Sequence, residues 1–474
     1  MTPDALLARF ARALARRAAH SADWDDAYRH VLPAAHESAT LFDATAADAA
    51  EQLAASLLAE LTPPWSRWFG LAPARAFEGG PEGQAAAFAL EGTADTLQSH
   101  LDRSNFTVEM HQAFLDLVVT GTGILLIEEA PPGEPSALRF SAVPVRTAVL
   151  EEGPSGRLDT VFRELRLTPA ELRARFPFAE LPRELEASEE DGLPPRLRVV
   201  EAVWPDEGGH RWMAVLDHDA PLALATGRFR EPPFIAFRWL KAPGETYGRG
   251  PVVKALPDIR TANRVVELVL KNASIAVTGI WQAEDDGVLN PATVRLEPGA
   301  IIPKAPGSAG LTPLAAPGSF DVSQLVLQDL RARIRSALLA DRLAAPRDAR
   351  QTATEVLERS AETARLLGAS YGRLQSELLT PLIARCLGVL SRRGEIPPVL
   401  LDGRRVAIRY ESPLARVQGR ADAANTLLFL EAVSRLGADA AAQVDGTAAA
   451  RWLARTLGAP AEILLPLTPL ETTE

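Results

Sequence analysis

Apolar residues recur at helical spacing through the first part of the chain. The pattern predicts helices from residue 4 to about residue 70, where Pro63 and Pro64 block their continuation. Three aromatic residues follow, and we expect them to close a helical core or a subunit contact rather than to bind a ligand. The helical positions are Leu6, Leu7, Phe10, Leu14, Leu53, Leu57, Leu58 and Leu61, and the aromatic residues are Trp65, Trp68 and Phe69.

A second pattern, the period-two alternation of strands, dominates residues 138–240. Alternating stretches predict a mostly antiparallel β region with one helical insert, for which Thr168 is the expected cap and Pro169 the first residue. Residues 80–130 predict more helix and then a strand. The strand-like residues there are Val118, Val119 and 124–127, around Gly121 and Gly123.

A turn rich in glycine and proline leads directly into a long helix. We expect that helix to begin at about Val252 or Pro257 and to end at Val277. Its apolar positions form a stripe, and its basic side chains lie largely off that stripe. The turn contains Pro243, Gly244, Gly248, Gly250 and Pro251; the stripe contains Ile259, Val265, Val266, Val269 and Leu270; the basic residues are Lys254, Arg260, Arg264 and Lys271.

Residues 281–318 differ in kind, because turns rich in proline and glycine separate two short expected strands, 293–297 and 300–304. Helical spacing returns after residue 319. Two helices of similar length therefore flank a small β tip, which is the layout of an antiparallel stalk with an elaborated end. The apolar positions of the second stalk helix are Leu325, Leu327, Leu330, Ile334 and Leu338.

A short break at 344–350 precedes the longest expected helix, 352–393. Pro381 should kink this helix, and Gly394 suits its end. A strand at 405–412 and a separate terminal bundle of helices at 420–465 complete the expected order.

Composition indicates a globular protein, since 47% of the 474 residues are apolar and 23% are charged. The net charge of −11 argues against a protein that coats nucleic acid, although DNA can pass nearby without being gripped. The single cysteine, Cys386, has no internal disulfide partner, and we expect it to be buried in a protein of a reducing compartment. No apolar run reaches the roughly 18–20 residues of a membrane span. The basic N-terminus is expected to be a first helix rather than a targeting peptide.

Catalytic and ligand-binding motifs are missing from the sequence. It contains no phosphate-binding loop, no HExxH and no Cys/His cluster, and the glycine pair at 121 and 123 lacks the third glycine of a dinucleotide site. Histidines such as His111 and His210 are scattered, and the acidic residues Glu284, Asp285 and Asp286 are typical of a solvated turn. We therefore expect no catalytic residue, no cofactor and no metal. Two alternatives stay open: a hydrolase or nuclease fused to helices, and another oligomeric virion or host protein such as a tail adaptor.

Two stretches of the sequence are especially distinctive: "YGRGP" at 247–251 and the segment that begins "TATEV" at residue 352. Together with other stretches, they resemble the head-to-tail connector, or portal, proteins of short-tailed bacteriophages. The resemblance implies an α+β portal-type fold. Its parts would be a wing of helices and antiparallel strands at 1–250, a stem of two helices at 251–280 and 319–343, a small β clip at 281–318, a channel loop at 344–350, a long kinked wing helix and following strand at 351–414, and a helical crown at 415–474.

The same resemblance implies a non-enzymatic function. A ring of twelve subunits would sit at one capsid vertex of the virion, after assembly in the host cytoplasm, as a passive conduit for DNA packaging and ejection. Its partners would be other copies of the chain, the major capsid protein, the terminase large subunit in transient contact, tail adaptor or nozzle proteins, and double-stranded DNA in the channel, with no membrane.

The family also implies three groups of site residues. Basic side chains would centre the duplex in the channel, although each could instead be a solvated or salt-bridging cation. The channel candidates are Arg342, Arg347 and Arg350, with Lys254, Arg260 and Lys271 as weaker ones; the corner between wing and stem is Tyr247, Gly248, Arg249, Gly250 and Pro251; the clip residues that would dock terminase and adaptors are Glu284, Asp285, Asp286, Leu289 and Arg295.

Overall fold

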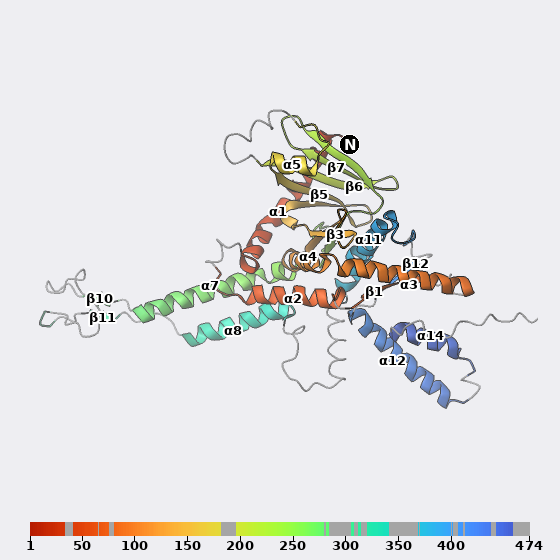
Figure 1. Cartoon of the computed structure of the whole chain (residues 1–474). Helices are drawn as coiled ribbons and strands as arrows, with labels where there is room; N and C mark the ends of the chain where they lie inside the picture. The colour runs from red at the N-terminus through yellow and green to blue at the C-terminus, as the bar shows by residue number, and fades with distance from the viewer. Residues whose placement is uncertain are drawn as a thin grey trace, which may run out of the picture.

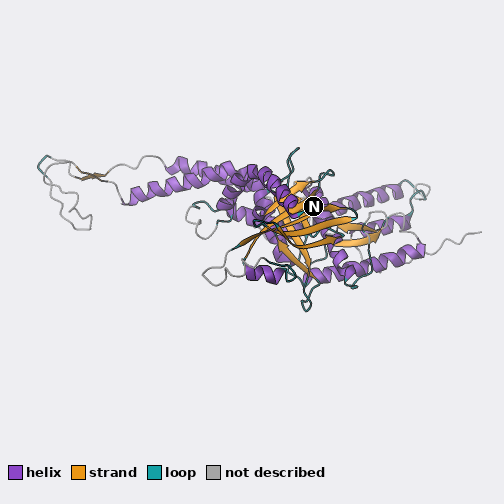
Figure 2. Cartoon of the chain, turned by 90° about the horizontal axis from the view of Figure 1, so that it is seen from above, coloured by secondary structure: helices purple, strands orange, loops and turns teal. Residues whose placement is uncertain are grey.

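A body of helices and sheets carries a two-helix stalk that projects to one side (Figure 1). Viewed from above, the stalk extends well beyond the strands at the centre of the body (Figure 2). This α+β architecture agrees with the fold class expected from the sequence. The computed structural model describes residues 1–33, 41–64, 66–74, 80–181, 196–278, 281–283, 305–307, 311–313, 320–340, 368, 370–399, 401, 406–410, 413–437 and 442–457.

Four long helices build the N-terminal part of the body: α1 (Pro3–Val31), α2 (Thr45–Leu61), α3 (Gly80–Asp102) and α4 (Phe106–Thr120). Thr2 caps α1, because its hydroxyl accepts a hydrogen bond from the backbone N–H of Ala5 at 3.3 Å. Trp68 and Phe69 are buried, with ring centroids 4.8 Å apart, which confirms that these two aromatic residues belong to the core. Trp65 lies outside the described residues.

A five-stranded antiparallel sheet lies across the top of the body in Figure 1, with its strands in chain order. Leu6 and Phe10 of α1 pack on one face of the sheet. Leu172 of α5 and Phe176, the residue after α5, pack on the other face. Thr168 caps α5 with a full capping box and Pro169 is its first residue, as expected. The strands are β4 (Ala148–Glu152), β5 (Leu158–Leu167), β6 (Leu197–Asp206), β7 (Gly209–Leu216) and β8 (Leu222–Phe229), and α5 is Pro169–Arg175; β8 was not anticipated from the sequence.

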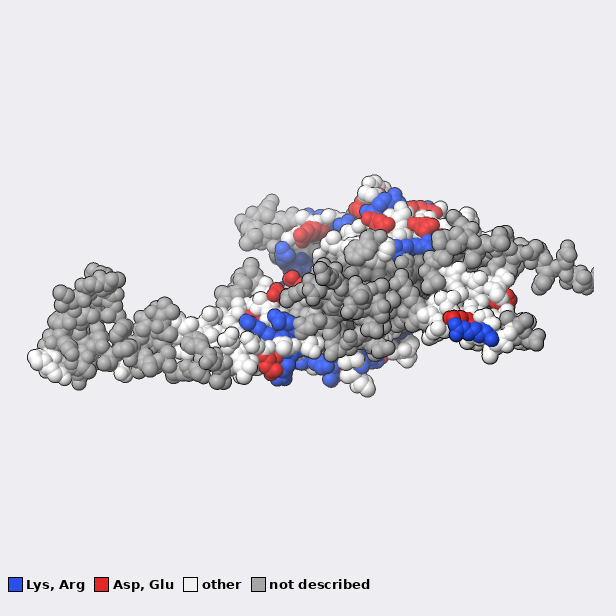
Figure 3. All heavy atoms as spheres, turned by 90° about the horizontal axis from the view of Figure 1, so that it is seen from below, with Lys and Arg blue, Asp and Glu red and all other residues white. Residues whose placement is uncertain are grey.

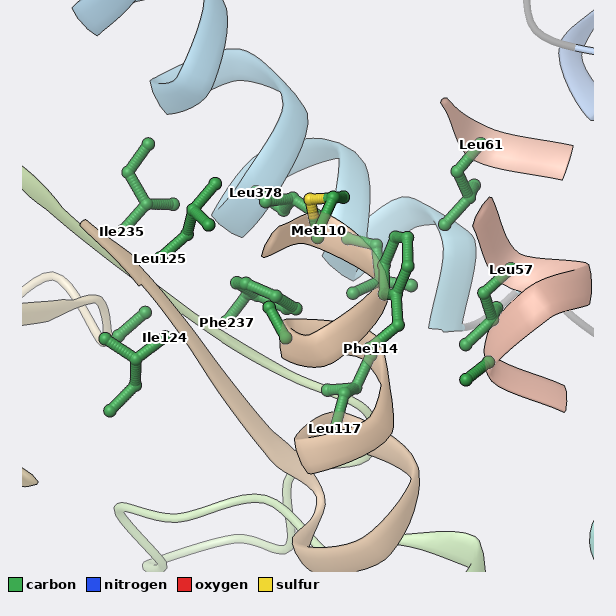
Figure 4. Close-up of a cluster of buried hydrophobic side chains, with 14 of the residues drawn as sticks. Leu57, Leu61, Met110, Phe114, Leu117, Ile124, Leu125, Ile235, Phe237 and Leu378 are labelled. Carbon is green, nitrogen blue, oxygen red and sulfur yellow. The ribbon is translucent and has the colours of Figure 1, made fainter. Parts of the chain in front are cut away.

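A smaller sheet of three strands, in the order β3-β2-β9, forms the centre of the main core. Figure 4 shows side chains of this sheet, among them Phe237, facing Phe114 of α4, with Leu57 of α2 and Leu378 nearby. Val118 and Val119 belong to α4, so the strand expected there was wrong: the helix runs to Thr120. The strands are β2 (Thr122–Glu129), β3 (Leu138–Ala142) and β9 (Phe234–Arg238).

The C-terminal part of the long expected helix closes this core from the other side. It contains a π-helical turn, η4 (Gln375–Leu379), followed by α11 (Thr380–Arg392). The turn lies directly before Pro381, where an irregularity was expected, because proline lacks the N–H that a regular helix would use. Gly394, with φ of +73°, lies just past the end of the helix, as expected. Residues 351–367 lie outside the described part of the chain.

The stalk consists of α7 (Pro251–Thr278) and α8 (Phe320–Ala337), which run side by side to a small hairpin (Figure 1). The described strands of that hairpin are β10 (Trp281–Ala283) and β11 (Leu311–Pro313), paired antiparallel. The two strands expected at 293–297 and 300–304 lie outside the described residues. The predicted antiparallel stalk is therefore present, with a different described strand pair at its tip.

The remaining described elements are two strands, two helices and a short 3-10 turn, η3 (Val145–Thr147). The strand β12 (Val406–Tyr410) was expected, but its antiparallel partner β1 (Phe69–Pro73) was not. The helices α12 (Pro413–Arg435) and α14 (Gly446–Leu457) pack together on the side of the body away from the stalk (Figure 1). Because α12 begins at Pro413, the expected boundary at residues 414 and 415 falls within its first turn.

The structure predicts that Cys386 does not react with thiol reagents in the folded protein. Its side chain is fully buried, and burial raises the pKa of the thiol to about 12. At pH 8 only about one thiol in 10,000 would be ionised at that pKa. We expect labelling by a small thiol reagent to be slower by roughly 1,000-fold or more than in urea-unfolded protein. Rapid stoichiometric labelling of the folded chain would contradict this burial.

Candidate functional site

The turn before the stalk lies against the C-terminal end of α4, backbone to backbone. A Cβ atom on Gly248 would lie 2.0 Å from the carbonyl oxygen of Gly121, and one on Gly250 would lie 2.6 Å from the nitrogen of Gly121. A Cβ on Gly121 would in turn meet the Gly250 nitrogen at 2.3 Å. Atoms at these distances overlap, so each of the three positions accepts only glycine without a backbone shift. The sequence motif is glycine-rich because two chain segments must touch there.

Backbone conformation separates the roles of these glycines. Gly121 has φ of +90° and ends α4 in the left-handed region, whereas Gly248 and Gly250 do not have positive φ. Gly121 therefore needs its glycine for both conformation and space, while the other two need it for space alone. Pro251 follows at once as the first residue of α7, where its fixed φ suits a helix start.

Hydrogen bonds lock the turn in this position. The N–H of Gly248 donates to the hydroxyl of Thr122 at 2.9 Å, and the N–H of Trp239 donates to the carbonyl of Gly121 at 2.9 Å. The N–H of Arg249 donates to the carbonyl of Leu240 at 2.7 Å, closing the turn on itself. These bonds connect the start of β2, the end of β9 and the start of α7, so the stalk cannot tilt without breaking them.

Tyr247 attaches the same turn to the large sheet. Its buried hydroxyl accepts a hydrogen bond from the N–H of Leu150 in β4 at 2.9 Å, and its ring contacts Trp24 of α1 edge-on, with centroids 5.1 Å apart. Burial raises the pKa of Tyr247 to about 12, so the hydroxyl is neutral near pH 7. Arg249 points outward and pairs with Glu245 at 2.5 Å.

A buried ion pair just before the turn was not anticipated from the sequence. Arg238, at the end of β9, is fully buried and lies 2.7 Å from Glu377 in the π-helical turn. Its remaining donors reach the carbonyl oxygens of Thr246 at 3.1 Å and Gly156 at 2.8 Å. Removing one partner of such a pair strongly destabilises a protein, because the other charge is left buried and unpaired. The signal available in the sequence was an arginine in an otherwise apolar strand, but its partner lies 139 residues away.

The three stalk cations expected in a channel differ in their surroundings, although all are exposed. Arg260 pairs with Asp26 of α1, and Lys271 pairs with Glu267 one turn earlier at 2.7 Å. Lys254 has no ion-pair partner among the described residues. It lies beside the turn, at the edge of a groove of about 710 Å³.

A carboxylate in the segment just before α2 fastens the base of the stalk to the body. Asp43 is buried and pairs with Arg331 of α8 at 2.8 Å, while its Oδ1 accepts the N–H of Thr45 at 3.0 Å. Burial alone would raise the pKa of Asp43, but hydrogen bonds from Thr45 and Arg331 outweigh it and hold the pKa below its usual value. On α7, Asn263 accepts the N–H of Phe42 at 2.7 Å.

Farther along the stalk, large apolar side chains are exposed in the single chain. Leu325 is 71% exposed, Leu270 53%, Leu268 49% and Val326 46%. They come from both helices, α7 and α8, on surface that the intramolecular helix pair does not cover. Several exposed apolar side chains on a long two-helix projection are typical of an interaction surface.

The stalk also differs from the rest of the chain in charge. The sequences of α7 and α8 contain seven Lys or Arg and four Asp or Glu residues, a net charge of +3, whereas the whole chain carries −11. From below, basic and acidic side chains gather near the root of the stalk (Figure 3). The projection is thus mildly basic in an acidic protein.

Several predicted site residues lie outside the described part of the chain. They are the channel candidates Arg342, Arg347 and Arg350 and the clip candidates Glu284, Asp285, Asp286, Leu289 and Arg295.

One cluster contains the three residue types of a catalytic triad, but its hydrogen bonds are not those of a triad. His100 Nε2 lies 2.6 Å from Glu395, and His100 Nδ1 lies 3.5 Å from Ser136 Oγ. The serine hydroxyl, however, donates to the carbonyl of His100 at 2.8 Å, and Nδ1 accepts the N–H of Ala137 at 3.2 Å. The serine is only 3% exposed, and the histidine nitrogen that faces it already accepts a hydrogen bond from a backbone N–H. The serine is therefore not activated as a nucleophile. The cluster joins α3, β3 and the end of α11.

The described residues contain no group of three or more His, Cys, Asp or Glu side chains that could hold a metal ion. His111 and His210 are both half-buried there. Among the helices described, none combines the length and apolarity needed to cross a membrane.

Comparison with known proteins gives one consistent result. A family model described as bacteriophage head to tail connecting protein matches residues 3–464. The probable portal protein of Bordetella phage BPP-1 is 25% identical over 97% of this chain and 88% of its own length. The portal protein of Salmonella phage epsilon15 is 21% identical over 90% and 80%, and that of Enterobacteria phage T3 is 22% identical over 76% and 67%.

Among solved structures, a chain from the virion of a native gene transfer agent particle aligns with 88% of this chain and 90% of its own length. Its TM-score is 0.38 and its sequence identity is 14%.

The backbone contact predicts that Gly248→Ala is strongly destabilising. The new methyl group would meet the backbone of Gly121, which cannot move away as a flexible side chain would. We expect a loss of about 3 kcal/mol or more, at the upper end of overpacking effects. The measurement is urea unfolding of the variant beside the wild type.

Gly92→Ala is the matched control, because Gly92 lies exposed in α3 with open space around its Cα. Alanine should stabilise that helix by up to about 1 kcal/mol. Equal effects of the two substitutions would show that the turn does not depend on close approach.

Proposed function

The chain belongs to the bacteriophage head-to-tail connecting proteins, the portal proteins of phage virions, and on that premise we propose that twelve copies form a ring at one capsid vertex. The ring conducts DNA passively during packaging and ejection. The observation that supports this most is the stalk: a rigid projection, fixed in angle by the glycine contact, with apolar side chains that its own chain leaves exposed.

Closure of a ring requires every copy to present its contact surfaces at the same angle. Three contacts restrict that angle: the close approach of Gly121 and Gly248, the hydrogen bond that Tyr247 accepts from β4, and the buried pair of Arg238 and Glu377. In our proposal 1–250 is the wing, α7 and α8 are the stem, and the turn at 247–251 is the corner between them. The exposed leucines of the stem are then buried between neighbouring copies.

The small net charge of the stem supports a conduit that binds DNA only weakly. Each phosphate that a protein neutralises increases affinity for DNA, so a channel dense in arginine would retard the polyanion it must release. A stem with a net charge of only +3 per copy, in which Arg260 and Lys271 are already paired with carboxylates, limits that attraction. We assign the role of centring the duplex to Lys254 on the stem and to Arg342, Arg347 and Arg350 at the channel loop, 344–350.

Family membership supports the remaining assignments, which we propose as well. The tip at 281–318, with Glu284, Asp285, Asp286, Leu289 and Arg295, docks terminase and later the tail adaptors, and residues from 415 onward form a crown. The wing contacts the major capsid protein. The protein itself catalyses no reaction and uses no cofactor, since terminase supplies the energy of packaging.

The proposal predicts that Leu325→Glu prevents ring assembly while leaving the chain folded. Leu325 is 71% exposed in the single chain, so folding does not depend on it. In the ring it is buried against a neighbour, where losing a leucine costs roughly 2–5 kcal/mol for each contact. Native mass spectrometry should show rings for the wild type and monomers or small oligomers for the variant.

Gln328→Glu provides the control, because it adds the same charge to an exposed position of the same helix without removing an apolar side chain. Rings should persist in this variant. A wild-type protein that stays monomeric at micromolar concentration would refute the ring, and unimpaired rings in Leu325→Glu would refute this stem contact.

A second prediction concerns the channel loop. In the proposal Arg347 and Arg350 contact the phosphates of the duplex, and such contacts position DNA without reading its bases. Replacing both arginines together by Ala should therefore leave the ring intact but change the packaging or retention of DNA. Any effect should weaken as salt rises, since charges separated by more than about 8–10 Å are screened at physiological ionic strength. Loss of rings in this variant would show that the arginines are structural.

A further inference from the structure

A cavity away from the stalk is lined by residues of α11 and of the strands β2, β6, β7, β8 and β9. Its volume is about 460 Å³, and five arginines and three glutamates line it together with apolar walls that include Trp212 and Phe234. The net charge of this lining is +2, in a chain of net charge −11. A concave site with this excess of guanidinium groups is suited to an anion.

Arg385 is the central residue of the cavity and is only 2% exposed. It donates to the carbonyl oxygen of Ile127 through Nε and Nη2 and to that of Glu231 through Nη1, each at 3.3 Å. A guanidinium has five N–H donors, so two have no acceptor among the described residues. Its plane also lies over the ring of Phe229, 5.0 Å from the centroid.

The positive charge of Arg385 has no close counter-ion among the described residues, because no carboxylate there lies within 4.0 Å of it. The carboxylate of Glu231 lies 3.6 Å from Arg230 and 3.7 Å from Arg392. Arg392 therefore shares one carboxylate, near the outer limit of an ion pair, with Arg230, and Arg385 has none within that limit in the described part of the chain.

The other charged residues of the lining are neutralised locally or stand apart. Arg175 is held by Glu201 at 2.9 Å, and Arg228 by Asp206 at 3.2 Å. Of the glutamates, Glu129 lies 3.7 Å from Arg393, and Glu128 has no ion-pair partner among the described residues. Glu128 opposes an anion, so the site favours a single small charge over a polyanion.

Burying a guanidinium without a paired carboxylate is unfavourable. Burial, and then repulsion by Arg392, lower the pKa of Arg385 to about 10. An anion seated beside both arginines would remove that penalty and use the two free N–H donors.

We propose that this cavity binds one oxyanion group, a phosphate or a carboxylate, held by Arg385 and Arg392. The two chemistries share the same planar recognition by guanidinium, and they correspond to different sources: a free inorganic ion, or the acidic side chain of a protein segment. The site shares no residue with the stem and channel assigned above, so its test does not depend on whether the ring forms.

The test is isothermal titration of purified full-length protein with inorganic phosphate and, separately, with N-acetyl-glutamate amide, at constant ionic strength set with chloride. For at least one of the two we expect saturable binding of one equivalent per chain below about 10 mM, the range of a few charge-assisted hydrogen bonds. Tighter binding of phosphate indicates a free ion, and tighter binding of the glutamate derivative indicates a protein carboxylate.

Three variants make the result specific. Arg385→Met should abolish binding, and Arg392→Gln should weaken it roughly tenfold, as removal of one charge-assisted contact does. Arg228→Gln should bind as the wild type does, because the Arg228 side chain is 59% exposed and already paired with Asp206. Arg392 is 46% exposed at its side chain, so its variant folds even where loss of Arg385 prevents folding.

Binding that is equal in the wild type and in Arg392→Gln would overturn the proposal. So would the absence of saturable binding of either anion to the wild type.

Discussion

The contact between Gly121 and the pair Gly248 and Gly250 is the constraint on which the rest of the structure depends. It joins the end of α4 to the start of α7 at a distance that excludes any side chain. The hydrogen bond from Gly248 to Thr122 and the buried pair of Arg238 and Glu377 hold the same junction from two more directions. A stalk rooted in this way transmits the orientation of the body to its far end, and identical orientation is what a closed ring of identical copies requires.

Local sequence signals predicted the elements well wherever the structure is decided locally. The cap at Thr168 and the stop at Gly394 each followed from the chemistry of one turn, and the helix expected from about Val252 or Pro257 begins at Pro251. No signal in the sequence indicated long-range strand pairing, such as that of β1 with β12 across more than 300 residues. The strand β8 was also missed. Val118 and Val119 suggested a strand because valine favours strands, but packing against the sheet made them helical.

The candidate site shows the same division. The glycine turn was found from its composition, and its role as the corner was inferred from the family resemblance. The reason for its glycines, however, lies in Gly121, which the sequence placed only among strand-like residues. Arg238 was missed because its partner is distant in sequence. Arg260 and Lys271 could be placed on a helix from their spacing, but only the structure shows that each faces a carboxylate.

The stalk combines two properties that the proposed conduit needs. In the proposed ring, its exposed apolar side chains would be buried between neighbouring copies, and its small positive charge would attract DNA only weakly. The most direct measurement is a three-dimensional reconstruction of the purified protein by cryo-electron microscopy. It should show a ring in which α7 of every copy lies beside a central channel, with Gly121 against Gly248 at its root. A ring whose stalks point away from the axis, or a particle with no central channel, would contradict this function.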